Sequence, residues 1–158
     1  MAGSELFLTK EGHKKLTDEL ERRRKITRKD LSKAIGEAIE QGDLRENAGY
    51  HAAKEEQGKN EARISEIELK LGKARIIDEE NININEAYVG SVVHLKDMDH
   101  GDEEKYRLLS GSEADHTKGE ISYESPVGRA LLGKKVGDII EIQVPAGKLR
   151  YKLMKISK

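Results

Sequence analysis

The stretch Gln41-Gly42-Asp43-Leu44-Arg45-Glu46-Asn47 separates two long helical patterns. From residue 10 to residue 41 the chain has no proline, and apolar side chains recur close to helical spacing. A second pattern runs from about residue 46 to residue 75, where Ile64, Ile67, Leu71 and Ala74 step by three, four and three positions. Because so few residues separate the two helices, they must fold back on each other. The sequence therefore predicts a long antiparallel coiled coil with this stretch at its tip.

The composition favours exposed helix and a modest core. Apolar residues make up 35% of the chain and charged residues 37%, against roughly 45–50% and 25% in typical globular domains. The formal charge of −1 argues against a general nucleic-acid coat, whose affinity comes from surplus lysine and arginine. The chain has no cysteine, which excludes disulfides and thiolate metal sites. No run approaches the ~20 apolar residues of a membrane span. We therefore expect a cytoplasmic, monomeric protein that does not contact a membrane.

The second half of the chain changes to strand patterns after a polar segment. Residues 78–86 carry several asparagines and are expected to form a linker. Short apolar or alternating runs then predict strands, while Ser125 and Pro126 are typical of a helix cap and first turn. We expect an α+β chain in which residues 1–77 form the coiled coil and residues 87–158 form a small domain. That domain would hold a mostly antiparallel sheet and one short helix.

The two carboxylates of the tip, Asp43 and Glu46, allow two interpretations. Their three-residue spacing fits a capping box, in which Asp43 accepts a hydrogen bond from the Glu46 amide and Glu46 reaches back. Gly42 would then end the first helix. In the second interpretation, an acidic tip on a long rod reaches into another molecule and delivers metal ligands there. The local pattern alone favours the capping box, and the two interpretations are compatible because a capped turn also holds carboxylates at the tip.

Longer motifs in both halves of the chain resemble one known family. The tip string continues as Tyr50-His51-Ala52-Ala53-Lys54-Glu55, and the second half contains Ser125-Pro126-Val127-Gly128-Arg129-Ala130-Leu131-Leu132-Gly133-Lys134. Together these strings resemble the signatures of the Gre family of bacterial transcript cleavage factors. The resemblance is collinear and covers essentially the whole chain.

The resemblance implies a function at a partner's active site. Gre factors bind bacterial RNA polymerase that has backtracked and extruded the 3′ end of its nascent RNA. A C-terminal domain similar in fold to FKBP domains docks at the rim of the secondary channel, and the coiled coil enters that channel. Asp43 and Glu46 would help to hold the second catalytic Mg²⁺ and orient a water, and the polymerase would then cleave its own transcript. The chain would have no cofactor of its own and would not be an enzyme.

The resemblance also assigns residues near the carboxylates. Asn47, Tyr50 and Lys54 would position the tip or contact RNA, although helix-start hydrogen bonds and hairpin packing explain the first two equally well. His51 is expected to support the hairpin, because no second histidine lies at ligand spacing beside it. In the C-terminal domain, Ser125 and Pro126 would contact the polymerase in addition to starting a helix.

Two positions depart from the family pattern. Ile39 stands where the family often has arginine, which would thin the basic surface that grips RNA. Gly49 stands where the family usually has an acid, and glycine inside a helix costs about 1 kcal/mol relative to alanine. These departures keep open a Gre-like protein that occupies the channel and inhibits the polymerase without cleavage.

Two further alternatives remain from the sequence. The FKBP-like fold suggests a peptidyl-prolyl isomerase, although residues 86–158 contain no phenylalanine or tryptophan with which to line a proline pocket. The other alternative is a coiled-coil adaptor without chemistry, in which Asp43 and Glu46 serve only as caps.

Overall fold

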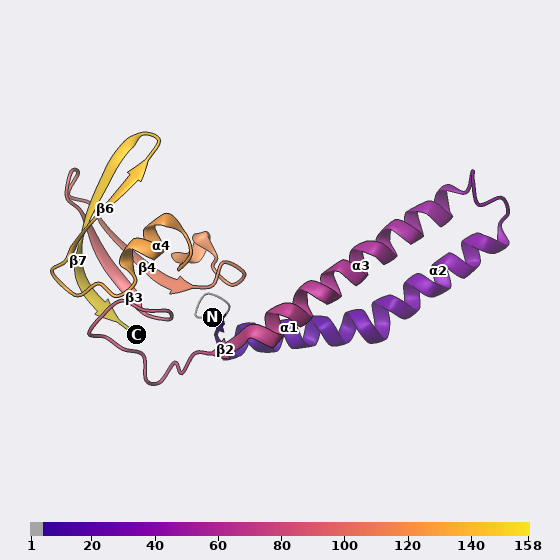
Figure 1. Ribbon diagram of the computed structural model, residues 1–158, viewed down its shortest axis with the longest axis horizontal. Helices are drawn as coiled ribbons and strands as arrows, with labels where there is room; N and C mark the ends of the chain where they lie inside the picture. Colours follow the sequence, from indigo (N-terminus) through magenta and orange to yellow (C-terminus); the bar gives the residue numbers. More distant parts are fainter. Residues whose placement is uncertain (1–4) are drawn as a thin grey trace. The chain divides into compact units, whose positions relative to one another are not determined.

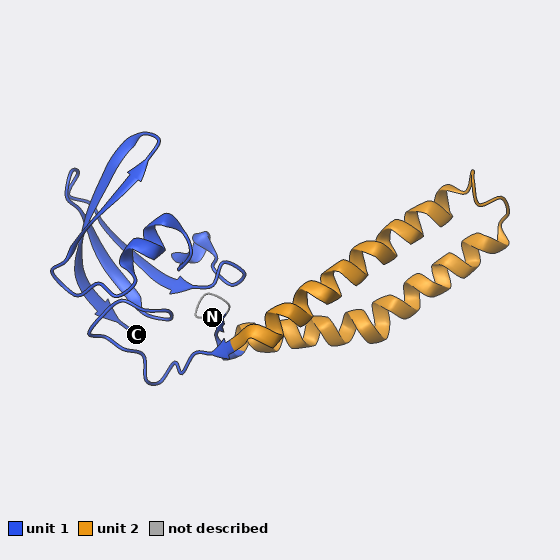
Figure 2. Cartoon of the chain, in the orientation of Figure 1, with its two compact units in different colours: residues 1–10, 75–158 blue, residues 11–74 orange. Residues whose placement is uncertain are grey.

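The computed structural model describes residues 5–158 (Figure 1), so the first four residues of the expected coiled-coil domain lie outside the described chain. The described residues form two compact units (Figure 2). One unit is Glu11–Ala74, and the other combines the described residues up to Lys10 with Arg75–Lys158. The fold is α+β, with a long helical hairpin and a sheet domain, as the sequence predicts.

The helical unit is a hairpin of two arms (Figure 1). The second arm is a single helix whose 26 residues rise about 39 Å at 1.5 Å per residue. The first arm is not the continuous helix that the sequence predicts, because five residues adopt the wider π-helical winding. The elements are α1 (Lys10–Arg22), η2 (Arg23–Thr27) and α2 (Arg28–Glu40) in the first arm and α3 (Ala48–Lys73) in the second.

The apolar seam of the hairpin is concentrated in the half away from the tip. Leu16 and Leu20 of the first arm are buried, as are Ile64 and Ile67 of α3. Toward the tip, Ala38 is the buried apolar residue of α2. Tertiary packing supplies most helix stability, so the tip half must depend on other contacts.

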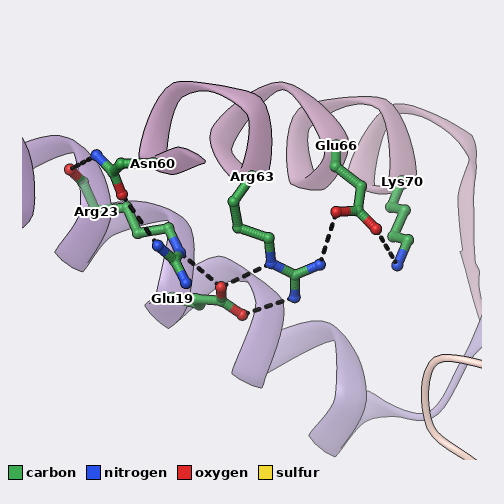
Figure 3. Close-up of polar contacts among 6 residues, drawn as sticks. All are labelled: Glu19, Arg23, Asn60, Arg63, Glu66 and Lys70. Carbon is green, nitrogen blue, oxygen red and sulfur yellow. Dashed lines mark hydrogen bonds and ion pairs between the residues drawn. The ribbon is translucent and has the colours of Figure 1, made fainter. Parts of the chain in front are cut away.

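A polar network joins the two arms at the level of η2 (Figure 3). Glu19 accepts a bidentate pair of hydrogen bonds from Arg63 at 2.8 and 2.9 Å. It also accepts one from Arg23 at 2.7 Å. The Arg63 guanidinium, together with that of Arg23, lowers the pKa of Glu19 to about 2. The buried Asn60 side chain accepts from Arg23 at 3.0 Å and donates to the Arg23 carbonyl at 3.4 Å. These bonds fix the register of the arms.

The other unit is built on a five-stranded sheet of order β5-β4-β3-β7-β6. All pairs are antiparallel except β4 with β5, which is parallel. A separate two-stranded sheet pairs β1 with β2. The sequence patterns predict the four longer strands but not the three-residue ones. The strands are β1 (Leu6–Leu8), β2 (Ala74–Ile76), β3 (Val92–Asp97), β4 (Glu103–Leu109), β5 (Glu120–Ser122), β6 (Ile139–Val144) and β7 (Gly147–Ser157).

One face of this sheet is covered by the short helix α4 (Pro126–Leu131). Leu131 packs in the same buried cluster as Val93 and Leu95 of β3. The helix approaches β5 closely, since a Cβ at Gly128 would lie 2.1 Å from the Ser122 carbonyl oxygen. Glycine is therefore required there. A 3₁₀ turn, η3 (His116–Lys118), precedes β5.

Residues 78–86, expected as a linker, belong to the same compact unit as the sheet. Ile82 packs against the buried pair Ile77 and Val89. Asp78 accepts hydrogen bonds from the Glu80 amide at 3.2 Å and from the Asn81 side chain at 2.8 Å. None of the helices in the described chain has the length and apolar character needed to cross a membrane.

Candidate functional site at the hairpin tip

The tip is the loop of residues 41–47 that joins α2 to α3. Gln41 ends α2 through a hydrogen bond from its amide to the Ala38 carbonyl at 3.1 Å. Gly42 follows with a φ of +127°, a conformation that side chains other than glycine rarely adopt. Gly42 is therefore the first residue beyond the C-cap of α2, and its backbone conformation prevents the helix from continuing, as the sequence predicts.

Asn47 holds the loop against both arms. Its Oδ1 accepts a hydrogen bond from the Tyr50 amide at 2.9 Å and so caps α3. Its Nδ2 donates to the Ala38 carbonyl, near the end of α2, at 2.6 Å. We call this pair of bonds the Asn47 clasp. It satisfies one free donor of α3 and bonds one carbonyl of α2, and both ends of the loop are thereby fixed.

The clasp contradicts the capping-box interpretation of Asp43 and Glu46. The helix starts at Ala48 rather than at Glu46, and its N-cap is Asn47. Asp43 instead accepts a hydrogen bond from the Arg45 amide at 3.0 Å, which closes a local turn. Both carboxylates are exposed, and within residues 5–158 neither forms an ion pair. The loop therefore presents two carboxylates that helix capping does not use.

The first turn of α3 contacts the loop through His51. The His51 Nε2 atom lies 3.3 Å from the Arg45 carbonyl oxygen, and the Tyr50 and His51 rings meet edge to face at 5.6 Å. These contacts agree with the supporting role expected for His51, although its partner could not be named from the sequence. Lys54 is exposed one turn further on, and its Nζ donates to Gln57 at 3.2 Å. Asp43, Glu46 and Asn47 thus lie in the loop, and Tyr50 and Lys54 lie in the first two turns of α3 that follow it.

The tip does not form a complete metal site by itself. Among the described residues, no group of three or more histidines, cysteines or acids could hold a metal ion. Mg²⁺ binds oxygen ligands and usually keeps several waters, with one or two protein carboxylates. Asp43 and Glu46 carry oxygen atoms of the kind that Mg²⁺ binds, and a role for them as metal ligands stays a prediction.

Ser125 and Pro126 lie in the sheet unit and have a clear structural role. The Ser125 Oγ accepts a hydrogen bond from the Gly128 amide at 3.1 Å and donates one to the Ser122 carbonyl at 2.6 Å. Pro126 is exposed at the first position of α4. The helix start that the sequence predicts is confirmed, and a partner contact at this site stays a prediction.

The chain combines a helical hairpin, which exposes two carboxylates at its tip, with a separate sheet unit. These two features define its class of protein. Comparison with known families agrees with this description. The model described as "Transcription elongation factor, N-terminal" matches residues 6–76, and "Transcription elongation factor, GreA/GreB, C-term" matches residues 82–158. The chain belongs to the GreA/GreB family of transcription elongation factors.

Individual relatives match over nearly their whole length. A transcription elongation factor GreA from Alkaliphilus oremlandii is 46% identical over 158 residues, which is all of this chain and 99% of the relative. A GreA from Chloroherpeton thalassium is 47% identical over 150 residues, or 95% of each chain. A solved structure of GreA factor homolog 1 from Thermus thermophilus is 35% identical with a TM-score of 0.45, and the match covers 98% of this chain and 99% of that one.

Proposed function

We propose that this protein binds backtracked bacterial RNA polymerase through its secondary channel and stimulates cleavage of the nascent RNA 3′ end, which rescues arrested complexes. One observation carries the proposal: Asp43 and Glu46 are exposed on a loop fixed by the Asn47 clasp, and neither is used to cap the helix. Membership of the GreA/GreB elongation factors supports it.

In this proposal the tip completes a metal site that the polymerase begins. Hydrolysis of a phosphodiester by two ions roughly 3.5–4 Å apart places one on the attacking and one on the leaving oxygen, and bound Mg²⁺ would supply that charge stabilisation. Asp43 and Glu46 supply oxygen ligands and accept hydrogen bonds from the attacking water. The Asn47 clasp keeps both carboxylates in place, which lowers the entropy cost of bringing them to the reacting phosphate. Lys54 would pair with an RNA phosphate, and Tyr50 would flank the RNA end.

The two units would have different roles in the complex with the polymerase. The second arm is about 39 Å long, which gives the tip the reach to enter a deep channel while the sheet unit stays outside. Ser125 and Pro126 would contact the polymerase at the channel rim. The protein would act as a monomer in the cytoplasm and would not cleave RNA without the polymerase, because its two carboxylates are too few to retain Mg²⁺ alone.

A channel-binding inhibitor without cleavage activity is the second candidate, and two observations favour it. Ile39 is 50% exposed on α2 close to the tip, so an apolar side chain occupies surface where a cation would grip RNA. Gly49 removes a carboxylate, although the backbone does not require glycine: a Cβ there would meet only the Asn47 Oδ1, at 3.4 Å.

The other two alternatives lose support from the structure. Phe7 packs edge to face against Tyr88 at 6.0 Å and against Tyr123 at 6.3 Å, so these two tyrosines contact a ring of the chain rather than lining a proline pocket. The adaptor hypothesis needs Asp43 and Glu46 as caps, and Asn47 has that role.

The test is transcript cleavage in stalled, backtracked polymerase complexes that carry RNA labelled at its 3′ end. We expect rapid release of short 3′ fragments with the wild-type protein and none with the Asp43→Asn, Glu46→Gln variant. Competition of this variant with the wild type shows whether it still binds the channel. Equal cleavage by both proteins would reject metal delivery by the tip, and competition without cleavage by the wild type would support the inhibitor.

A further inference from the structure

The five-stranded sheet has a second face, opposite α4, whose side chains are mostly basic. Val93 and Leu95 of β3 point into the core with Leu131 of α4. Successive side chains of a strand point to opposite faces, so His94 and Lys96 point away from the core. Their cross-strand partners share that side. We call the set of side chains on it the basic sheet face: Val92, His94, Lys96, Glu103, Lys105, Arg107, Glu120, Ile139, Glu141, Gln143, Lys148, Arg150, Lys152, Lys155 and Ser157.

One pair of like charges, Lys96 of β3 and Lys152 of β7, lies directly opposed at the centre of this face. His94 is the register partner of Lys105 on β4 and of Lys155 on β7, and Lys96 is the partner of Lys152. Adjacent strands are only about 4.8 Å apart, and like charges in opposed positions destabilise a sheet. Burial, and then the charges of Lys105 and Lys155, keep the pKa of His94 below its ordinary value. Glu103 of β4 is the other partner of Lys96, so the repulsion is confined to the side of Lys152.

Intramolecular ion pairs relieve the charge only around the margin. Arg107 pairs with Glu79 at 3.5 Å, Lys148 with Glu141 at 3.4 Å, and Arg150 with Asp99 at 2.9 Å. Over residues 5–158, no such pair involves the central lysines, which are Lys96, Lys105, Lys152 and Lys155. The chain as a whole has a charge of −1, so the basic centre is a local feature and not a consequence of composition.

Apolar groups accompany the lysines. Met154 is the extra residue where the pairing of β3 with β7 shifts register, and it is 42% exposed. It lines a shallow cavity of about 300 Å³ together with His94, Leu95, Lys105 and Lys155 and with two acids, Glu103 and Glu104. Ile139, opposite Lys152, is 57% exposed.

This mixture selects one kind of partner. Protein interfaces combine apolar contacts with a polar rim, and exposed methionine adapts to irregular partners. The basic sheet face carries no aromatic side chain, whereas proteins that bind single-stranded nucleic acid stack bases on aromatic rings.

We propose that the basic sheet face binds an acidic protein segment whose carboxylates pair with Lys96, Lys105, Lys152 and Lys155 and whose apolar side chain enters the cavity beside Met154. The face lies on the side of the sheet opposite α4, so it is a different surface from the one at Ser125 and Pro126. A bound acidic segment would remove the repulsion between the opposed lysines.

The experiment is an NMR titration of the full chain with a short synthetic peptide of glutamates that carries one central leucine. We expect saturable shifts of the Met154 methyl and of the His94 and Lys152 amides. The Lys96→Gln, Lys152→Gln, Lys155→Gln variant should bind about tenfold more weakly, as expected for the loss of several exposed ion pairs. Replacing the leucine of the peptide by serine should weaken binding as well.

A matched variant removes the same charge from elsewhere in the sheet unit: Lys118→Gln, Lys134→Gln, Lys135→Gln. Equal weakening by this control would mean that only net charge matters and would overturn the proposal, as would the absence of saturable shifts. Duplex DNA is titrated in parallel, and tighter binding of DNA to the same residues would assign the face to nucleic acid instead. Thermal melting checks the fold of each variant, and the loss of opposed charges on the face should leave the melting temperature unchanged or raised.

Discussion

Replacing Asn47 by alanine would open the tip while leaving Asp43 and Glu46 in the sequence. The variant loses the N-cap of α3, which typically costs about 1 kcal/mol, and the bond to the Ala38 carbonyl, which typically contributes about 0.5–1.5 kcal/mol. Asn47 is half-buried, and its two bonds join the two ends of one loop. A combined loss of about 2 kcal/mol would reduce the ratio of closed to open loop by roughly 30-fold.

Two assays separate loop opening from loss of binding. Amide hydrogen exchange at Tyr50 and His51 should become faster in Asn47→Ala, because these amides depend on the side chain and backbone of residue 47. Stimulated transcript cleavage should fall by an order of magnitude or more, whereas competition for the polymerase should change little, since the sheet unit is untouched.

Asn47→Asp serves as the control because it keeps one hydrogen bond of the Asn47 clasp and removes the other. Aspartate still accepts the Tyr50 amide and remains a good N-cap, but it has no proton to donate to the Ala38 carbonyl. We expect the helix start to be retained and cleavage to fall to an intermediate level. Cleavage and exchange rates equal to wild type in Asn47→Ala would refute the reasoning that this residue holds the tip in place.

Three further predictions concern stability. Gly49→Ala should raise the stability of the hairpin by about 1 kcal/mol, because a Cβ there meets only the Asn47 Oδ1 at 3.4 Å; an unchanged or lower melting temperature by circular dichroism would count against it. Glu19→Gln should destabilise the hairpin in urea by up to about 3 kcal/mol, because Arg63 then loses its bidentate carboxylate partner and keeps only Glu66. The pKa of Glu19 is lowered to about 2 from 4.5, so its contribution is complete above pH 4.5 and is lost as the pH falls toward 2; the same fall in the variant would contradict this assignment. Gly128→Ala should destabilise the sheet unit by more than about 2 kcal/mol, since its Cβ would lie 2.1 Å from a backbone oxygen, and an unaffected second transition on melting would disprove the close packing.

The hairpin could be predicted because it depends on spacing along the chain. The step of Ile64, Ile67 and Leu71 and the short connection are local properties, and they suffice for two antiparallel helices. The π-helical segment could not be predicted in this way. The Arg23 carbonyl accepts hydrogen bonds from the Arg28 amide and from Asn60, and Asn60 is 37 positions away on the other arm.

The error at the tip has a similar cause. Sequence rules recognise Asp43 and Glu46 as a capping box because the spacing is right. The chosen cap must also donate a proton to the Ala38 carbonyl on the other arm, and a carboxylate at neutral pH cannot do so, whereas the amide of Asn47 both accepts and donates. The packing of Ile82 could not be predicted either, because the asparagines around it indicate a polar linker. Ile82 is partly buried against Ile77 and Val89, which lie outside residues 78–86.

In the proposed function, Asp43 and Glu46 act as metal ligands inside the polymerase. The most direct test is the Mg²⁺ dependence of cleavage in backtracked complexes, with wild-type protein and with the Asp43→Asn, Glu46→Gln variant at saturating concentrations. We expect the wild type to lower the Mg²⁺ concentration needed for half-maximal cleavage several-fold, and the variant to leave it at the value of the polymerase alone. An identical Mg²⁺ dependence for both proteins, with a difference only in the maximal rate, would contradict the claim.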